Sequence, residues 1–315
     1  MTCAVSVDLD GLPHYYRIHG LGEPPPELEH RILQRALPRA AQLFASHRIP
    51  VTWFVIGRDA DATLDSARAD NAAALRALSD RGDELANHSY THPYELARLS
   101  ASEAESEISN CDRVLRSISG KAPHGFRAPG YDLSVSMLAS LARHAYRYDS
   151  SIFPAPAYYA AKLAVMGALA LLRRPSGAVI TNPRALVAPT DPYRPSMSAP
   201  WRRGMSPVVE LPIAVTPYAR LPAIGTSLLV APEAIRSRIV ASMSPRPFFN
   251  FELHGIDFAD ADSDGIPGEL VSRQPDLRVP IAEKLDRLSR TLDQLSARWT
   301  FATLSHVAAE TQRSL

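Results

Sequence analysis

The 315-residue chain lacks most features that would assign it to a specialised class of protein. Its two cysteines, Cys3 and Cys111, are too few for a disulfide framework and too far apart for a CxxC redox pair or a zinc ribbon. The formal net charge is only +1, so no overall field would draw the chain onto nucleic acid. The most apolar run, Leu163–Leu172, has 10 residues, whereas a membrane-spanning helix needs about 20.

The N-terminal sequence, MTCAVSVDLDG, also lacks the basic region and apolar core of a signal peptide. We therefore expect a cytoplasmic protein. Hydrophobic residues make up 46% of the chain and charged residues 21%, which is an ordinary globular balance. The length fits either two domains or one large α/β unit.

Short apolar stretches alternate with segments of helical spacing along most of the chain. Helical spacing covers Leu28–Leu43, Ala72–Leu78, Pro232–Met243 and Ile281–Leu295, while a Gly- and Pro-rich loop is expected up to Pro26. Ser102 and Glu105 predict a capping box for a further helix. Strands are expected at Ala4–Asp8, Val51–Ile56, Glu84–Asn87, Gly125–Arg127, Val208–Leu211, Phe248–Leu253 and Trp299–Phe301. This alternation predicts a parallel sheet or barrel.

One segment interrupts this alternation. Residues 175–222 hold 10 of the 27 prolines, and proline fixes φ and removes a backbone donor. We therefore expect an irregular excursion on the surface there. Together with the apolar run before it, this segment defines an insertion at about residues 155–206 in a single domain that covers residues 1–315.

Two groups of residues suit metal chemistry. Asp8 and Asp10 follow the first expected strand, and their two-residue spacing places both carboxylates on one face, where they need a metal ion or an arginine. His88 and His92 are four residues apart and can reach one ion if the segment forms a helical turn. An aspartate with two histidines suits Zn²⁺ and leaves positions open for water and substrate. A lone pair of histidines is a weak signal, so the order of motifs matters more.

Seven short motifs occur in a characteristic order along the chain. They are SVDLDG, TWFVIG, GDELANHSYTHP, GFRAPGYD, YRYDSSIFP, VVELPIAV and FELHGIDF. This series resembles the polysaccharide deacetylases of the NodB homology type, carbohydrate esterase family 4, and is most similar to the exopolysaccharide-associated branch. The resemblance implies a distorted (β/α)₇ barrel and a metal-dependent hydrolase that removes an N-acetyl or N-formyl group from an amino sugar, free or carrier-linked.

The resemblance also implies roles for individual residues. Asp10, His88 and His92 would bind the metal, and Asp8 would be the general base, with Arg127 paired to it. The metal expected first is zinc, with cobalt, nickel and iron as alternatives. The family's usual TFDDG has no residue between its acids, whereas Leu9 separates them here, so the two aspartates could exchange roles.

Three further residues take roles by the same resemblance. His254 would be the general acid, and the backbone N–H of Gly130 would stabilise the oxyanion. Asp149 matches the acid that supports the histidine, and Asp257 is its rival for this role.

Two other functions remain open at this point. Amidohydrolases of the same superfamily that open allantoin or cyclic imides also tolerate a D-x-D arrangement, and a non-catalytic descendant could bind carbohydrate alone. Residues 160–174 add a question about partners, because an apolar helix ending in Arg173 and Arg174 is either core, a lid, or a peripheral membrane contact. In the last case the substrate would be lipid-linked.

Overall fold

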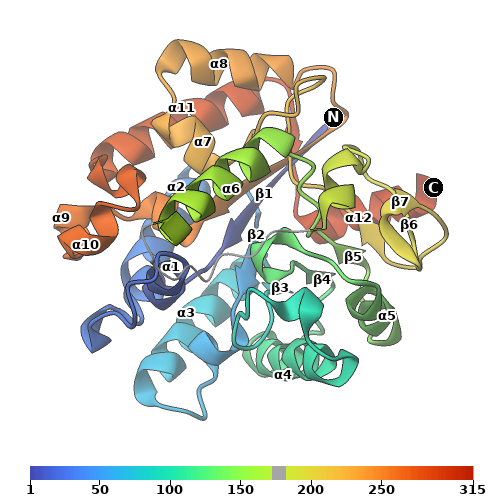
Figure 1. Cartoon of the computed structure of the whole chain (residues 1–315), viewed down its shortest axis with the longest axis horizontal. Helices are drawn as coiled ribbons and strands as arrows, with labels where there is room; N and C mark the ends of the chain where they lie inside the picture. The colour runs from blue at the N-terminus through green and yellow to red at the C-terminus, as the bar shows by residue number, and fades with distance from the viewer. Residues whose placement is uncertain (172–181, 315) are drawn as a thin grey trace.

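A computed structural model describes residues 1–171 and 182–314, and its centre is a curled parallel sheet (Figure 1). Seven strands run in the order β9-β1-β2-β3-β4-β5-β8, and β10 pairs with the start of β1. They are β1 (Thr2–Asp8), β2 (Val51–Val55), β3 (Glu84–Asn87), β4 (Gly125–Phe126), β5 (Tyr148–Asp149), β8 (Val209–Glu210), β9 (Phe248–His254) and β10 (Thr300–Phe301). This arrangement confirms the expected distorted (β/α)₇ barrel.

An irregular segment brings the two ends of the sheet together. After β8, the backbone N–H of Ala214 donates to the carbonyl of Asn250 in β9 (3.3 Å). The Asn250 side chain donates in turn to the Leu211 carbonyl (3.1 Å). The barrel is therefore completed by side-chain and loop hydrogen bonds where a regular strand ladder is missing.

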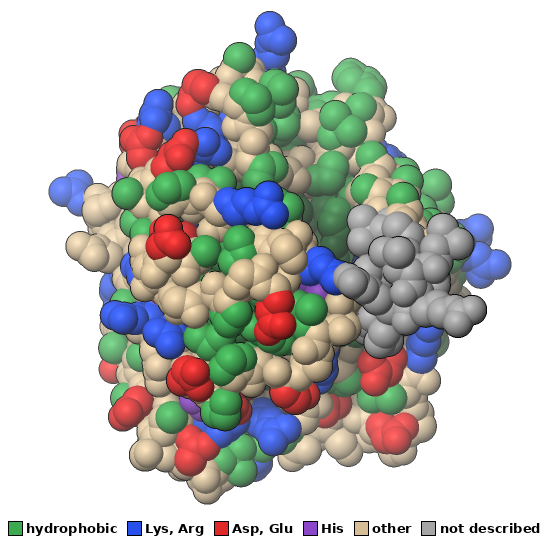
Figure 2. Space-filling model, turned by 60° about the vertical axis from the view of Figure 1, so that its left-hand side comes forward, with side chains coloured by type: hydrophobic (Ala, Val, Ile, Leu, Met, Phe, Trp, Pro, Cys, Tyr) green, Lys and Arg blue, Asp and Glu red, His purple; other side chains and the backbone are tan. Residues whose placement is uncertain are grey.

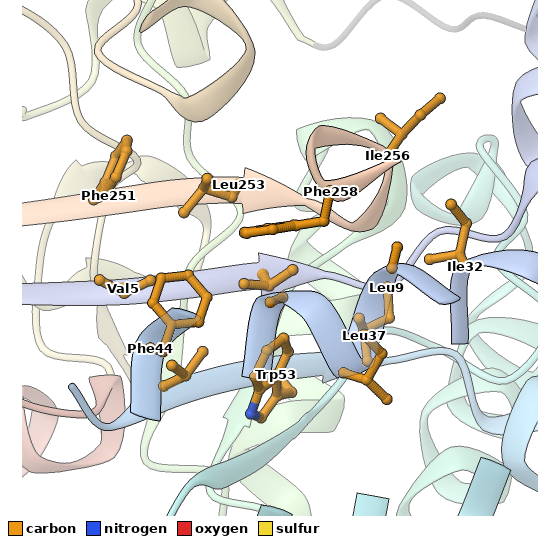
Figure 3. Packing of buried hydrophobic residues seen from close by; sticks show 14 of the residues in the cluster. Val5, Leu9, Ile32, Leu37, Phe44, Trp53, Phe251, Leu253, Ile256 and Phe258 are labelled. Carbon is orange, nitrogen blue, oxygen red and sulfur yellow. The ribbon is translucent and has the colours of Figure 1, made fainter. Parts of the chain in front are cut away.

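Helices surround the sheet and bury its outer face. The main ones are α1 (Leu12–Ile18), α2 (Leu37–Ser46), α3 (Ser66–Arg81), α4 (Ala101–Ser119), α5 (Val135–Arg143), α6 (Pro156–Leu171), α7 (Gly225–Val230), α8 (Glu233–Ser242), α11 (Ile281–Ser296) and α12 (Leu304–Ser314). Shorter turns include α9 (Ala261–Asp264) and α10 (Gly268–Val271). Because helices and barrel interior cover both faces, β1, β2 and β9 are buried along almost their whole length. Figure 3 shows Phe44, Trp53 and Phe258 packed beside Val5 and Phe251 from these strands.

The sequence predictions differ from the structure in several elements. Helix α1 begins immediately after Gly11, where we expected only a loop, because Pro13 occupies its first turn and proline is compatible with that position. Strand β5 and helix α5 were not predicted. The capping box of α4 lies two residues earlier than expected: Ser100 and Glu103 form it reciprocally, not Ser102 and Glu105.

The proline-rich segment is less irregular than the sequence indicated. Strands β6 (Pro195–Ser196) and β7 (Ala199–Arg203) form a hairpin, preceded by a short 3₁₀ turn, Pro183–Val187. Tyr193 is buried, and its hydroxyl donates to the Pro200 carbonyl (2.7 Å). The insertion boundaries at about 155–206 remain a prediction, and residues 172–181, including Arg173 and Arg174, lie outside the described part of the chain. Within that part, no helix is long and apolar enough to cross a membrane.

The corrected capping box gives a matched pair of variants. Ser100→Ala removes the side chain that accepts from the Glu103 backbone N–H, so we expect the free energy of unfolding to fall by about 1 kcal/mol. Ser102→Ala is the control and should change it by less than about 0.5 kcal/mol. Urea unfolding followed by circular dichroism measures both. Equal losses would contradict the assignment of Ser100 as the N-cap.

Candidate functional site

The candidate active site lies at the carboxyl ends of the barrel strands, where parallel barrels place their functional loops. Asp8 and His254 end β1 and β9 at the same register position. His88 directly follows β3, and Arg127 directly follows β4. A cavity of about 380 Å³ opens at this end of the barrel. Because β1 and β9 are parallel neighbours, Asp8 and His254, which are 246 positions apart in the chain, meet at one cavity.

The structure brings Asp10, His88 and His92 together as the sequence predicted. Asp10 Oδ1 lies 3.2 Å from His88 Nε2 and 3.3 Å from His92 Nε2, and all three residues are buried. They form a group whose ligand atoms lie within 4.8 Å of one another. This set resembles the three-ligand metal sites that leave positions open for water and substrate.

The histidine segment reaches this geometry without forming a helical turn, which corrects the sequence interpretation. Ser89 and His92 have positive φ angles of 63° and 57°. Glu107 in α4 accepts from the backbone N–H groups of Tyr90 (2.9 Å) and Thr91 (2.8 Å). Left-handed backbone is costly for residues other than glycine, so the surrounding hydrogen bonds hold the loop in a strained, fixed shape.

Two observations show that the three residues fit a metal ion. His88 Nδ1 lies 2.8 Å from the Arg127 carbonyl, which can only accept, so Nδ1 carries a proton. In the neutral ring, the Nε2 lone pair therefore faces Asp10 and is available to a metal. Asp10 Oδ1 is buried and accepts no hydrogen bond from the described residues. A buried carboxylate oxygen that faces two imidazole Nε2 atoms needs positive charge, and a divalent ion supplies it.

The pKa shifts at these three residues reflect burial and the charges of their neighbours. Burial lowers the pKa of His92 well below its usual range, which keeps the imidazole neutral and able to ligate. Burial alone would raise the pKa of Asp10, but the neighbouring His92 and His88 hold it well below its usual range. For His88, burial is outweighed by Asp8 and Asp10, and the pKa is raised. The carboxylates therefore attract positive charge to this position.

Asp8 forms a buried ion pair with Arg127. Arg127 Nη1 donates to Asp8 Oδ1 (2.5 Å), and Nη2 donates to Ser6 Oγ (3.0 Å) and Ser150 Oγ (2.9 Å). The guanidinium also lies over the Phe54 ring, 4.0 Å from its centroid. Burial raises the pKa of Asp8, and the charge of Arg127 counteracts that effect. Asp8 Oδ2 is 3.9 Å from His88 Nε2, so this carboxylate lies directly beside the group that fits a metal.

The acid beside His254 is Glu252, and neither Asp149 nor Asp257 occupies that place. Glu252 Oε1 lies 3.0 Å from His254 Nδ1, and this contact raises the pKa of His254 well above its usual range although burial opposes it. The Asp257 carboxylate accepts from the His254 backbone N–H (2.9 Å) and from Thr226 Oγ1 (3.0 Å), and neither hydrogen bond involves the His254 ring. Asp149 accepts from Ser151 Oγ (2.7 Å) and faces Glu210. The sequence motif pointed to Asp149, and the structure replaces it with Glu252.

Glu252 and Tyr131 are the site residues that the sequence analysis missed. Glu252 lies two residues before His254 on the same strand, so the two-residue period of a strand was a signal that could have found it. The Tyr131 hydroxyl lies 3.0 Å from both Glu252 Oε1 and His254 Nε2. Gly130 lines the cavity with a φ of 68°, and Tyr131 has a φ of 63°. No local pattern indicates these contacts of Tyr131.

The remaining walls of the cavity are mainly apolar and aromatic. Helix α1 contributes Tyr15 and Ile18, and α6 contributes Tyr158, Lys162 and Met166. Figure 1 shows α6 on the near side of the sheet, beside β1, and its residues share the cavity with Asp8 at the end of β1. Figure 2 shows green apolar side chains gathered around a hollow on one face of the molecule. A pocket with apolar walls and a few polar groups at its base is typical of a small-molecule site.

Comparisons with known proteins agree with this architecture. A family model described as polysaccharide deacetylase matches residues 30–148 of this chain. A peptidoglycan deacetylase from Helicobacter pylori is 24% identical over 47% of this chain and 48% of its own length. A chitooligosaccharide deacetylase from a Bradyrhizobium strain is 32% identical over 34% of this chain and 45% of its own length. The matches span less than half the length of these relatives.

Solved structures share the fold over almost the whole chain. A Mycobacterium smegmatis protein classed as a polysaccharide deacetylase has a TM-score of 0.62 at 16% identity, covering 99% of this chain and 90% of its own. An allantoinase, Puue, has a TM-score of 0.58 at 12% identity, covering 98% of this chain and 89% of its own. At these identities the likeness concerns the fold alone.

The geometry separates the roles of the two aspartates at the end of β1. Asp10→Asn should weaken Zn²⁺ binding by more than the 10- to 100-fold typical of changes around metal ligands, because its oxygen faces both histidines. Asp8→Asn is the matched control and should retain the ion, since Asp8 Oδ1 pairs with Arg127. Calorimetric titration of metal-free protein with Zn²⁺ measures both. Loss of binding in Asp8→Asn with retention in Asp10→Asn would exchange the two roles.

Proposed function

We propose that the protein is a metal-dependent N-deacetylase of an N-acylated amino sugar. The observation that carries this proposal is the meeting, in one cavity, of the Asp10–His88–His92 group with the Asp8–Arg127 pair and the Glu252–His254 pair. The match of residues 30–148 to the polysaccharide deacetylase family model supports the same chemistry. Hydrolysis of an amide needs a base for water and an acid for the departing amine, and these two pairs supply both.

Asp10, His88 and His92 would hold the ion, with zinc expected first and cobalt, nickel and iron as alternatives. A bound divalent ion would polarise the substrate carbonyl and make water more acidic. Asp8 would accept the proton of the attacking water at its Oδ2, because Oδ1 is engaged by Arg127. Arg127 would orient this carboxylate and keep it ionised despite its burial.

The leaving side of the reaction would use the opposite wall of the cavity. His254, charged through its contact with Glu252, would be the source of the proton that the departing nitrogen requires. The backbone N–H of Gly130 would stabilise the negative charge that develops on the carbonyl oxygen. Both residues line the same cavity as Asp8, so base and acid flank one substrate position.

Helix α6 supports a finer proposal about the substrate. Its Lys162 is the one lysine or arginine among the described residues that line the cavity. Burial lowers the pKa of Lys162 to about 8, and an anion close by would restore its charge. The adjacent Leu163 is 48% exposed. A lipid-linked amino sugar, with a phosphate beside Lys162 and α6 in peripheral contact with a cytoplasmic membrane surface, fits these features.

The first test is release of acid from a panel of N-acyl sugars. Wild-type protein should release acetate or formate from at least one N-acetyl or N-formyl amino sugar, free or phosphate-linked. Removal of metal by a chelator should abolish turnover, and Zn²⁺ should restore it, because the cavity then regains its positive charge.

Three results would overturn this proposal. Full activity in the absence of metal would contradict the proposal that Asp10, His88 and His92 bind a metal ion needed for turnover. Ring opening of allantoin or a cyclic imide without turnover of any sugar would favour the amidohydrolase. Sugar binding without any product would favour a carbohydrate-binding protein.

The second test concerns Lys162. Lys162→Ala should raise KM about 10-fold for an N-acetyl amino sugar 1-phosphate, since a hydrogen bond to a charged group contributes about 1.5–3 kcal/mol, and leave KM for the neutral methyl glycoside unchanged. Lys121→Ala, at an exposed lysine remote from the cavity, is the matched control. An equal rise in KM for the sugar phosphate and the methyl glycoside would contradict the proposal that Lys162 binds a phosphate. Preference for the phosphate-linked sugar in vesicles over the soluble one would identify a lipid carrier.

A further inference from the structure

Both ring nitrogens of His254 are engaged by neighbouring side chains. Glu252 Oε1 lies 3.0 Å from Nδ1, and the Tyr131 hydroxyl lies 3.0 Å from Nε2. The Tyr131 hydroxyl also donates to Glu252 Oε1 (3.0 Å), so the three groups form a closed set. Because Glu252 faces Nδ1, a proton that leaves His254 towards the substrate departs from Nε2. At that atom it meets the oxygen of Tyr131 first.

Tyr131 is held firmly in this position. Its φ of 63° lies in the left-handed region, and its ring packs edge-on against Phe153, with centroids 5.5 Å apart. The ring is buried, yet Tyr131 and His254 both line the cavity. Burial and the nearby Glu252 raise the pKa of Tyr131 well above its usual range, so the phenol keeps its proton. A fixed, protonated hydroxyl that contacts both the histidine and the cavity is suited to passing a proton.

We propose that Tyr131 is a catalytic residue that transfers the proton from His254 to the departing amine. This inference rests on the proposed function, because it concerns the acid step of that same hydrolysis. Glu252 is a positioning residue in this scheme, since it orients and charges His254 without meeting the substrate.

The step balances as two linked proton transfers. As the carbon–nitrogen bond breaks, its electron pair goes to the nitrogen, which takes the hydroxyl proton of Tyr131. Tyr131 takes the Nε2 proton of His254 at the same time, so the phenol ends neutral and the imidazolium becomes imidazole. Before the step, the hydroxyl hydrogen rotates from Glu252 towards the nitrogen, which requires no movement of the ring.

Direct donation by His254 is the competing scheme, and it makes the opposite prediction for one variant. If the histidine donates directly, the Tyr131 hydroxyl obstructs Nε2, and its removal leaves activity unchanged or raises it. If Tyr131 transfers the proton, removal of its hydroxyl prevents the proton of His254 from reaching the departing amine, and amide hydrolysis slows. The Tyr131→Phe variant keeps the ring and its contact with Phe153 and removes only the oxygen.

The experiment compares an amide with an activated ester in metal-loaded protein. For the N-acetyl amino sugar, Tyr131→Phe should lower kcat about 100-fold with little change in KM, as loss of an acid catalyst does. For 4-nitrophenyl acetate, whose leaving group departs without protonation, it should retain wild-type kcat. A merely structural role would lower both rates equally. Tyr193→Phe, which removes another buried tyrosine hydroxyl far from the cavity, is the matched control and should retain both activities.

The outcomes separate this inference from the proposed function. Undiminished amide hydrolysis in Tyr131→Phe would overturn the transfer through Tyr131 and leave the deacetylase proposal intact. Equal loss on amide and ester, with unchanged Zn²⁺ content and melting temperature, would also overturn it. A wild-type protein that cleaves the ester and no amide would overturn the proposed function itself, and the inference with it.

Discussion

The buried pair of Arg127 and Asp8 is the interaction on which the rest of the site depends. Arg127 reaches through the barrel interior from the end of β4 to Asp8 and Ser6 on β1 and to Ser150 after β5. Its carbonyl oxygen also fixes the tautomer of His88. One residue therefore sets the orientation of the expected base and of one expected metal ligand. Removing it would leave a buried carboxylate without a partner, which is the costly way to break an ion pair.

Charged and titratable groups of different kinds lie on different sides of the cavity. On one side, buried Asp10 faces the Nε2 atoms of His88 and His92, and this group suits a positive ion. On the other side, Glu252 gives His254 a stable positive charge. Asp8 lies between the two and is balanced by Arg127. Pairs of titratable groups whose environments push their pKa values apart are typical of sites that need an acid and a base together.

Long apolar strands and ordered motifs made much of this architecture predictable from the sequence. Strands β1, β2 and β9 are continuous buried runs, and the residues that follow them lie where the sequence placed them. Strands of only two residues are harder to predict from the sequence. Strand β5 was missed because its two residues have no alternating pattern of their own, and only their pairing with β4 and β8 makes them a strand. Asp149 was misassigned because a motif gives position along the chain but not the direction of a side chain. Its carboxylate points to Ser151 and Glu210, and burial together with Asp149 raises the pKa of Glu210 well above its usual range.

The contact between Glu107 and the histidine loop links the outside of the barrel to its centre. Glu107 lies on α4, a helix of 19 residues that packs against α3 and α5, and it holds two amides of the loop that carries His88 and His92. The spacing of the two imidazoles is thus maintained from a helix that lines no part of the cavity. A substitution in the packing of α4 would therefore change the distance between the two imidazoles without replacing either histidine.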